Sequence, residues 1–145
     1  MLTTPPVTDV ASHLRLVVAR TARRLRQEAG QDLSPSLTSA LASIDRHGPL
    51  TPSELAKIER IQRPTATRLL AGLTEKELVS RAADPSDKRC SIVSITLGGR
   101  AMLKRIRSRK NAYLARRMKE LPDDEVAALE RAAEILERVL EEDRR

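Results

Sequence analysis

Residues 51–73 read TPSELAKIERIQRPTATRLLAGL and contain two helix starts in close succession. The first is a capping box, because the Thr51 hydroxyl can accept a hydrogen bond from the Glu54 amide while the Glu54 carboxylate reaches back to Thr51. The second must begin around Arg63 and Pro64, since proline is tolerated only in the first turn of a helix. Two short helices joined by a few residues predict a helix-turn-helix.

A β-hairpin is predicted directly after this pair. Residues 78–82 and 91–95 are short runs with partial apolar alternation, and the intervening DPSDKR of residues 84–89 has the composition of a turn. A helix-turn-helix followed by a hairpin is a winged helix. Such a unit places its second helix in a major groove and its hairpin tip on the adjacent backbone or minor groove.

Longer helices flank this unit on both sides. Helical spacing of apolar residues predicts a helix from Val10 to near Gly30, one from Ser34 to His47, one from the cap at Thr96 to about Lys119, and one from Pro122 onward. The expected fold is mostly α with a small β-hairpin wing, as one winged-helix domain over residues 1–145. Its winged helix-turn-helix core spans 34–96, and residues 10–30 and 97–145 form N- and C-terminal dimerisation helices, because their apolar stripes exceed what the core can cover.

The amino-acid composition limits the classes of molecule that the chain could bind. The net charge of +7 favours a polyanion, and one Tyr with no Phe or Trp argues against modules that stack unpaired bases. A single cysteine cannot form an internal disulfide framework, so we expect a cytoplasmic location. No apolar stretch is long enough for a membrane helix, and no secretory signal is visible at the N-terminus.

The candidate DNA contacts lie on the second helix and at the hairpin tip. The guanidiniums of Arg63 and Arg68 can each donate two hydrogen bonds, to O6 and N7 of guanine, and threonine hydroxyls can hydrogen-bond to phosphate. At the tip, Asp87 can hold the guanidinium of Arg89 in one direction, which suits a narrow minor groove. The predicted site residues are Arg63, Pro64, Thr65, Thr67, Arg68, Asp87, Lys88 and Arg89.

Here the chain resembles the MarR family of bacterial transcription regulators. The resemblance is carried by Leu55-Ala56, residues 64–70, Leu73, Leu78-Val79, Arg81, residues 84–89, Val93, Ile95-Thr96 and Gly99-Arg100. It implies a homodimeric winged-helix repressor, less often an activator, on a pseudo-palindromic operator of double-stranded DNA. It also implies that a small, often phenolic, effector or oxidation releases the operator, as in many members.

Two departures from the family pattern bear on the local geometry. Glu77 stands where the family usually has glycine, and since a left-handed backbone there costs about 1 kcal/mol or more, we expect the turn to differ. Ala71-Gly72 replaces a pair that is often polar, which removes backbone contacts to DNA and weakens the end of the helix.

Two other functions compete with the DNA-binding regulator. The winged helix could serve as a docking surface of a protein-interaction adaptor, or Cys90 could sense redox state beside Lys88 and Arg89. An enzyme has no support, because no paired carboxylates, nucleophile elbow or phosphate-cradling glycine loop is present. The two histidines, His13 and His47, are too far apart in sequence to suggest a metal site, so no cofactor is expected.

Overall fold

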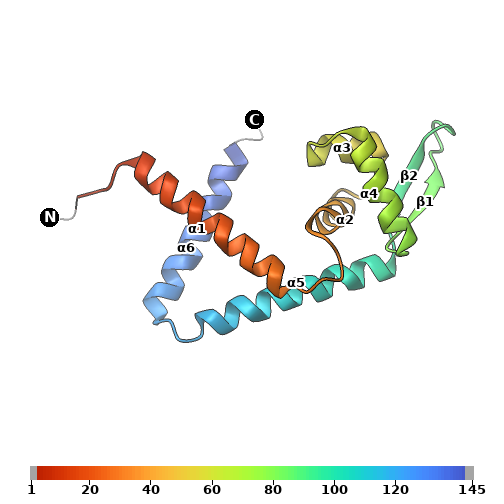
Figure 1. The fold of residues 1–145 in the computed structure, drawn as a ribbon. Helices are drawn as coiled ribbons and strands as arrows, with labels where there is room; N and C mark the ends of the chain where they lie inside the picture. Colours follow the sequence, from red (N-terminus) through yellow and green to blue (C-terminus); the bar gives the residue numbers. More distant parts are fainter. Residues whose placement is uncertain (1–2, 143–145) are drawn as a thin grey trace. The chain divides into compact units, whose positions relative to one another are not determined.

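The computed structural model describes residues 3–142, drawn as a ribbon in Figure 1. The chain divides into two compact units. The first unit runs up to Lys110 and the second begins at Asn111. The elements are α1 (Val7–Glu28), α2 (Pro35–His47), α3 (Pro52–Glu59), α4 (Arg63–Glu75), β1 (Val79–Ala83), β2 (Ser91–Ile95), α5 (Leu97–Met118) and α6 (Asp123–Glu142). The predicted class, mostly helical with a small hairpin, is confirmed. None of these helices is long and apolar enough to cross a membrane.

The core of the first unit is aliphatic and lies among α2, α3, α4, β2 and α5. Leu41, Leu55, Leu73 and Val93 are wholly buried, and α5 adds Leu103. Among the described residues, no polar or charged side chain is buried. Burial of these apolar side chains, worth roughly 25 cal/mol per Å², therefore holds the helix-turn-helix in place.

The predicted helix caps are present. The Ser34 hydroxyl accepts from the Leu37 amide at 3.2 Å. At the start of α3, the Glu54 amide donates to the Thr51 hydroxyl at 3.2 Å and the Thr51 amide donates to the Glu54 carboxylate at 3.1 Å. Thr96 accepts from the backbone amide three residues later at 3.0 Å, and α5 follows. These local signals explain why the helix starts were predictable.

The two strands pair antiparallel, with Val79 opposite Ile95 and Ala83 opposite Ser91. A further bridge, which we had not predicted, joins Leu50 to Val93. The Leu50 amide donates to the Val93 carbonyl at 3.0 Å, and the Val93 amide donates back at 2.8 Å. The middle of β2 is therefore tied to the segment between α2 and α3.

The turn from α4 into β1 corrects one expectation. Glu77 has φ 59°, in the left-handed region, so the turn keeps the conformation that we expected Glu77 to avoid. The surroundings hold it from two sides: the Leu78 amide donates to the Leu73 carbonyl at 3.0 Å, and the Thr96 hydroxyl donates to the Glu77 carbonyl at 2.8 Å. The start of α5 can pack this closely against the turn because residue 99 is glycine: a Cβ at Gly99 would lie 2.2 Å from the Leu78 carbonyl oxygen.

The second unit contains the end of α5 and all of α6. Within it, the Arg116 guanidinium lies 5.7 Å from the centre of the half-exposed Tyr113 ring. Helix α6 opens with three acidic residues, which favour the positive end of the helix dipole. Large apolar side chains on α6, among them Leu129 and Leu140, are exposed in the single chain.

Candidate nucleic-acid interface

Helix α4 presents one polar face to solvent. Ala66, Leu70 and Leu73 are buried on the inner side. Of the residues predicted to contact DNA, Thr65 is half-buried, and the others on this helix are exposed: Arg63, Pro64, Thr67 and Arg68.

The first turn of α4 has no side-chain cap. Gln62 occupies the cap position without a hydrogen bond from its side chain, and Pro64 has no amide hydrogen to satisfy. Amide groups at such a helix start attract an anionic oxygen, with the helix dipole adding to the attraction. The exposed N-terminal end of α4 is thus suited to a phosphate near the guanidinium of Arg63.

The turn between α3 and α4 is fixed by a second left-handed residue, which we had not predicted. Arg60 has φ 55° and ψ 47° and ends α3, and the Ile61 amide donates to the Ala56 carbonyl at 3.0 Å. Glu59 anchors the same end of α3 to α2, because its carboxylate accepts from the Ser39 hydroxyl at 2.8 Å and also from the Ser43 hydroxyl. Backbone contacts therefore shape the turn from α3 into α4, and the Glu59 side chain holds the end of α3 against α2.

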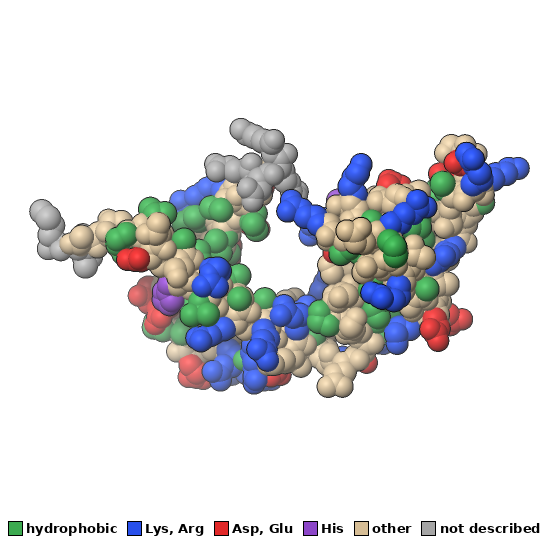
Figure 2. Space-filling view, turned by 45° about the horizontal axis from the view of Figure 1, so that its top comes forward, with side chains coloured by type: hydrophobic (Ala, Val, Ile, Leu, Met, Phe, Trp, Pro, Cys, Tyr) green, Lys and Arg blue, Asp and Glu red, His purple; other side chains and the backbone are tan. Residues whose placement is uncertain are grey.

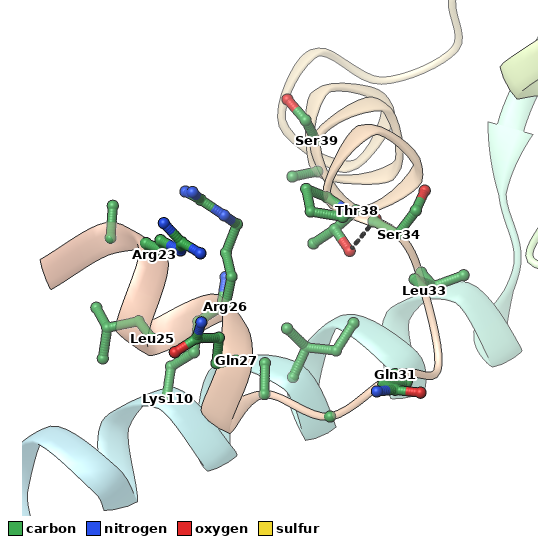
Figure 3. Close-up of a pocket in the computed structure, with 16 residues that line it drawn as sticks. Arg23, Leu25, Arg26, Gln27, Gln31, Leu33, Ser34, Thr38, Ser39 and Lys110 are labelled. Atoms are coloured by element: carbon green, nitrogen blue, oxygen red, sulfur yellow. Dashed lines mark hydrogen bonds between the residues drawn. The ribbon is translucent and has the colours of Figure 1, made fainter. Parts of the chain in front are cut away.

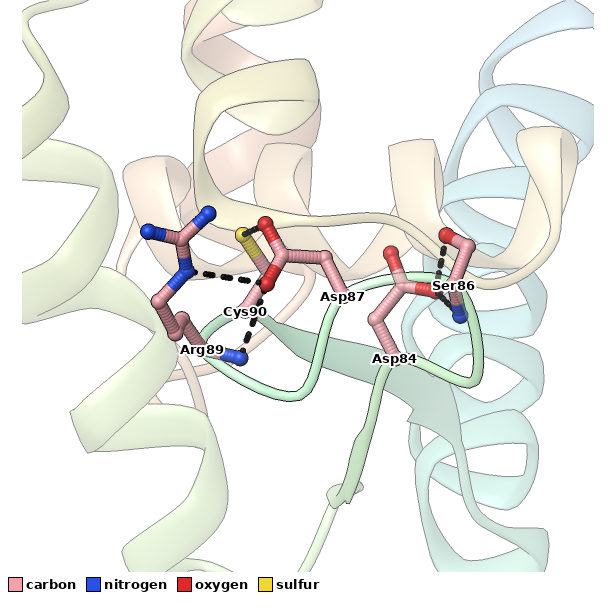
Figure 4. A network of polar contacts seen from close by, with 5 residues as sticks. All are labelled: Asp84, Ser86, Asp87, Arg89 and Cys90. Carbon is pink, nitrogen blue, oxygen red and sulfur yellow. Dashed lines mark hydrogen bonds and ion pairs between the residues drawn. The ribbon is translucent and has the colours of Figure 1, made fainter.

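The hairpin tip is an ordered network built around two aspartates (Figure 4). Asp84 accepts from both the amide and the hydroxyl of Ser86, at 2.9 and 2.7 Å. Asp87 accepts from the amide and the Nε of Arg89, at 3.1 and 3.2 Å, and from the Cys90 thiol at 3.7 Å. The hydrogen bonds from Ser86 lower the pKa of the Asp84 carboxyl. The pKa of the Asp87 carboxyl is also lowered, mainly by the hydrogen bond from the Arg89 backbone amide. The predicted brace between Asp87 and Arg89 is present.

The Arg89 guanidinium stays available while it is braced. Its side chain is 91% exposed, against 40% for that of Asp87. Lys88 beside it is also exposed, whereas Cys90 is half-buried. The loop therefore directs a cation outward at its tip.

A side-chain contact joins the C-terminal end of α4 to strand β1 of the hairpin. The Arg81 Nε donates to the Thr74 hydroxyl at 3.3 Å, and that hydroxyl donates to the Leu70 carbonyl at 2.7 Å. Arg81 was predicted only as part of the family pattern, not as a contact of α4. Alternation along β1 places Arg81 on the same side as the buried Val79, which is the signal that could have placed it against α4.

Basic side chains are spread over the winged-helix elements. In the view of Figure 2, Lys and Arg side chains lie on the surface of the winged-helix elements and at the hairpin tip, where acidic side chains lie beside them. Helix α5 is basic throughout, and no acidic residue occurs between Leu97 and Lys119. Among the described residues, no group of three or more His, Cys, Asp or Glu side chains is placed to hold a metal ion.

The first unit also contains a groove of about 1040 Å³ between α1 and α2, with α5 along its floor (Figure 3). Its apolar lining includes Leu25, Leu33 and Ile106. Figure 3 shows the Arg23 and Arg26 side chains on the α1 side, across from hydroxyl-bearing side chains of α2. No acidic or aromatic side chain lines the groove, so its charged side chains are all cationic.

Comparisons with known proteins agree on one family. The family model described as MarR family matches residues 33–91. The HTH-type transcriptional regulator ML2140 of Mycobacterium leprae is 34% identical over 134 residues, which cover 92% of this chain and 94% of that protein. The multiple antibiotic resistance protein MarR of Salmonella typhimurium is 34% identical over 100 residues, 68% of this chain and 69% of that protein.

Solved structures share the fold over nearly the whole chain. A crystal structure of a transcriptional regulator protein from Pseudomonas aeruginosa PA01 superposes with a TM-score of 0.82 at 36% identity. It covers 94% of this chain and 98% of that one.

Proposed function

The chain belongs to the MarR family of DNA-binding transcription regulators, and from this premise we propose that it is a repressor that binds a pseudo-palindromic operator as a homodimer in the cytoplasm. Residues 34–96 would read the DNA, and residues 10–30 and 97–145 would join the two copies. The observation that carries the proposal is the braced wing: Asp87 holds the exposed guanidinium of Arg89 on a hairpin that Arg81 ties to α4.

The reading mechanism follows from the two elements. The exposed face of α4, with Arg63, Thr67 and Arg68, is shaped for the base edges of a major groove. The wing would place Arg89 on the neighbouring minor groove or backbone, where a narrow groove concentrates negative potential. Pro64 and the half-buried Thr65 line the N-terminal end of α4, and Lys88 adds a cation beside Arg89.

Exposed apolar stripes support the homodimer. Val18 on α1 and Leu140 on α6 remain 48% and 66% exposed in the single chain. Helices with such stripes are stable in water when a second copy covers them, and a two-fold dimer would place its recognition helices about 34–36 Å apart. Sedimentation equilibrium at micromolar concentration should give a dimer, and a monomer would contradict this part of the proposal.

Selection of bound fragments from genomic DNA tests the function. We expect one short inverted repeat to be bound at least about a thousandfold more tightly than random duplex, with affinity falling steeply as salt rises. Equal, weak binding to all sequences would instead favour an adaptor that uses the winged helix as a docking surface.

A small organic anion in the groove would release the operator. The Arg23 and Arg26 guanidiniums can pair with a carboxylate or phenolate while the aliphatic floor takes the rest of the molecule. A panel of aliphatic and aromatic carboxylates should include compounds that dissociate the complex. Arg26→Ala should abolish that release and leave operator binding intact, whereas Arg20→Ala, on the same helix outside the groove, should change neither.

A further inference from the structure

The connection between α1 and α2 is short and held at several points. Helix α1 ends at Glu28 and α2 begins at Pro35. Between them, Ala29 and Leu33 are buried against the core. Since the connection has so little free chain, its geometry determines the direction in which α1 leaves the DNA-binding unit.

Arg109 of α5 clamps this connection. Its Nη1 atom donates to the Ala29 carbonyl at 2.9 Å and pairs with the Asp32 carboxylate at 2.6 Å. Gly30 lies against the same guanidinium with φ +91°, and a Cβ at that position would be 2.7 Å from Nη1. One cation therefore joins a carbonyl and a carboxylate of a turn about eighty residues earlier in the sequence. The positive φ of this turn favours glycine at position 30.

The stretch of α5 that carries the clamp is itself fixed to the core. Leu103 and Ile106 are buried, and Asp45 of α2 pairs with Arg100 at 3.8 Å and with Arg107 at 3.7 Å. Arg109 thus stands on a helix segment that is anchored to α2. The α1–α2 connection is thereby held to the unit that carries α4.

We propose that Arg109 is a positioning residue that sets the half-site spacing read by the homodimer, by fixing the exit direction of α1. The inference rests on the proposed dimer, in which α1 belongs to the subunit interface and α4 to the DNA. One added base pair moves a half-site by about 3.4 Å and about a tenth of a turn. A dimer with a fixed α1 direction tolerates such a shift poorly, and a dimer with a loose connection tolerates it better.

The test uses the full chain and a series of duplexes. The selected inverted repeat is synthesised with its centre shortened by one base pair or lengthened by one or two, and binding is followed by fluorescence anisotropy. For Arg109→Ala, we expect the affinity ratio between the best and the next-best spacing to fall by about threefold to fivefold, the range open to one partly exposed ion pair. Affinity for a duplex with a single half-site should stay unchanged. Asp32→Asn should act in the same direction but less strongly, because the bond to the Ala29 carbonyl remains.

Arg105→Ala is the matched control, since it removes the same charge from an exposed position on the same helix. It should keep the parent spacing ratio. Hydrogen exchange gives a readout without DNA: in Arg109→Ala, amides of residues 29–33 should exchange faster while those of α3 and α4 keep their protection.

The outcomes separate the inference from the function. A parent protein that prefers no inverted repeat overturns the proposed function, and the spacing role with it. A parent that prefers one, together with an Arg109→Ala variant of unchanged spacing ratio, overturns the role of Arg109 alone. Unchanged exchange at residues 29–33 would also overturn it, because the clamp would then fix nothing.

Discussion

Individual backbone positions in this fold are strained where two elements must meet at a fixed angle. Arg60 and Glu77 both adopt left-handed φ, at the turn inside the helix-turn-helix and at the turn into the wing. A left-handed residue with a Cβ costs roughly 1–2 kcal/mol, and glycine relieves most of that cost. The buried contacts of Leu73, Leu78 and Gly99 around the second turn hold the strained conformation in place.

Replacement of Glu77 by glycine should therefore stabilise the protein. We expect the free energy of unfolding to rise by about 1 kcal/mol, which raises Tm by roughly 2–4 °C for a chain of this length. Thermal unfolding followed by circular dichroism measures the effect. Glu75→Gly is the control, because it removes the same charge from a right-handed helical position and should lower Tm. Equal shifts in both variants would show that charge, not backbone strain, is responsible.

Protonation of Asp87 should loosen the wing. The hydrogen bonds from Arg89 lower the pKa of this carboxyl below its ordinary value of 3.8 in the folded chain. The ionised Asp87 carboxylate therefore stabilises the ordered loop at all pH values above 3.8. This stabilisation of the loop is lost as the pH falls through the lowered pKa of Asp87.

An NMR titration of the Arg89 amide should have its midpoint below pH 3.8. Asp87→Asn should remove the transition from that resonance and leave the similar one at Ser86, which reports on Asp84. A midpoint at or above the ordinary value would mean that the brace is not formed in solution.

At the scale of elements, the sequence predicted what is local and missed what joins distant segments. The helix starts at Ser34, Thr51 and Thr96 depend on residues within three positions of each other, and they were predicted. The bridge from Leu50 to Val93 joins residues far apart in sequence, and nothing in either stretch signals the other. The hydrogen bond from Arg109 to Ala29 is another long-range contact that periodicity cannot reveal.

The link between α4 and the wing yields a prediction at the same scale. Thr74→Val keeps the shape of the side chain but removes the hydroxyl that accepts from Arg81. We expect operator affinity to fall by about twofold to fivefold, as for the loss of one exposed hydrogen bond. Tm should change little, since Thr and Val have similar helix propensities.

Thr74→Ser should restore binding, because it returns the hydroxyl. The double variant Thr74→Val with Arg81→Gln should bind no more weakly than Arg81→Gln alone, since the two side chains act as one contact. Additive losses in anisotropy titrations would show that each side chain meets the DNA separately.

In the proposed homodimer, DNA binding and subunit contact fall on different helices of the chain. The winged-helix elements carry exposed polar and cationic faces over an aliphatic core, whereas α1 and α6 expose apolar stripes that a second copy would cover. The net charge of +7 supplies attraction to any nucleic acid, so specificity must come from how α4 and the wing are arranged. That residues 63–68 and 87–89 face the same way stays a prediction, and the structure adds the hydrogen bond from Arg81 to Thr74 that joins the hairpin to α4.

The central claim is that the exposed face of α4 and the braced wing bind duplex DNA together, as one surface. Titration of the Arg89→Ala variant against the selected operator tests this claim most directly. The account predicts weaker operator binding at an unchanged Tm, because the Arg89 side chain is 91% exposed and contributes little to folding. Arg68→Ala in parallel should relax base preference at one position in each half-site by about 1–3 kcal/mol. An Arg89→Ala variant that binds the operator as tightly as the parent would remove the wing from the mechanism and contradict the claim.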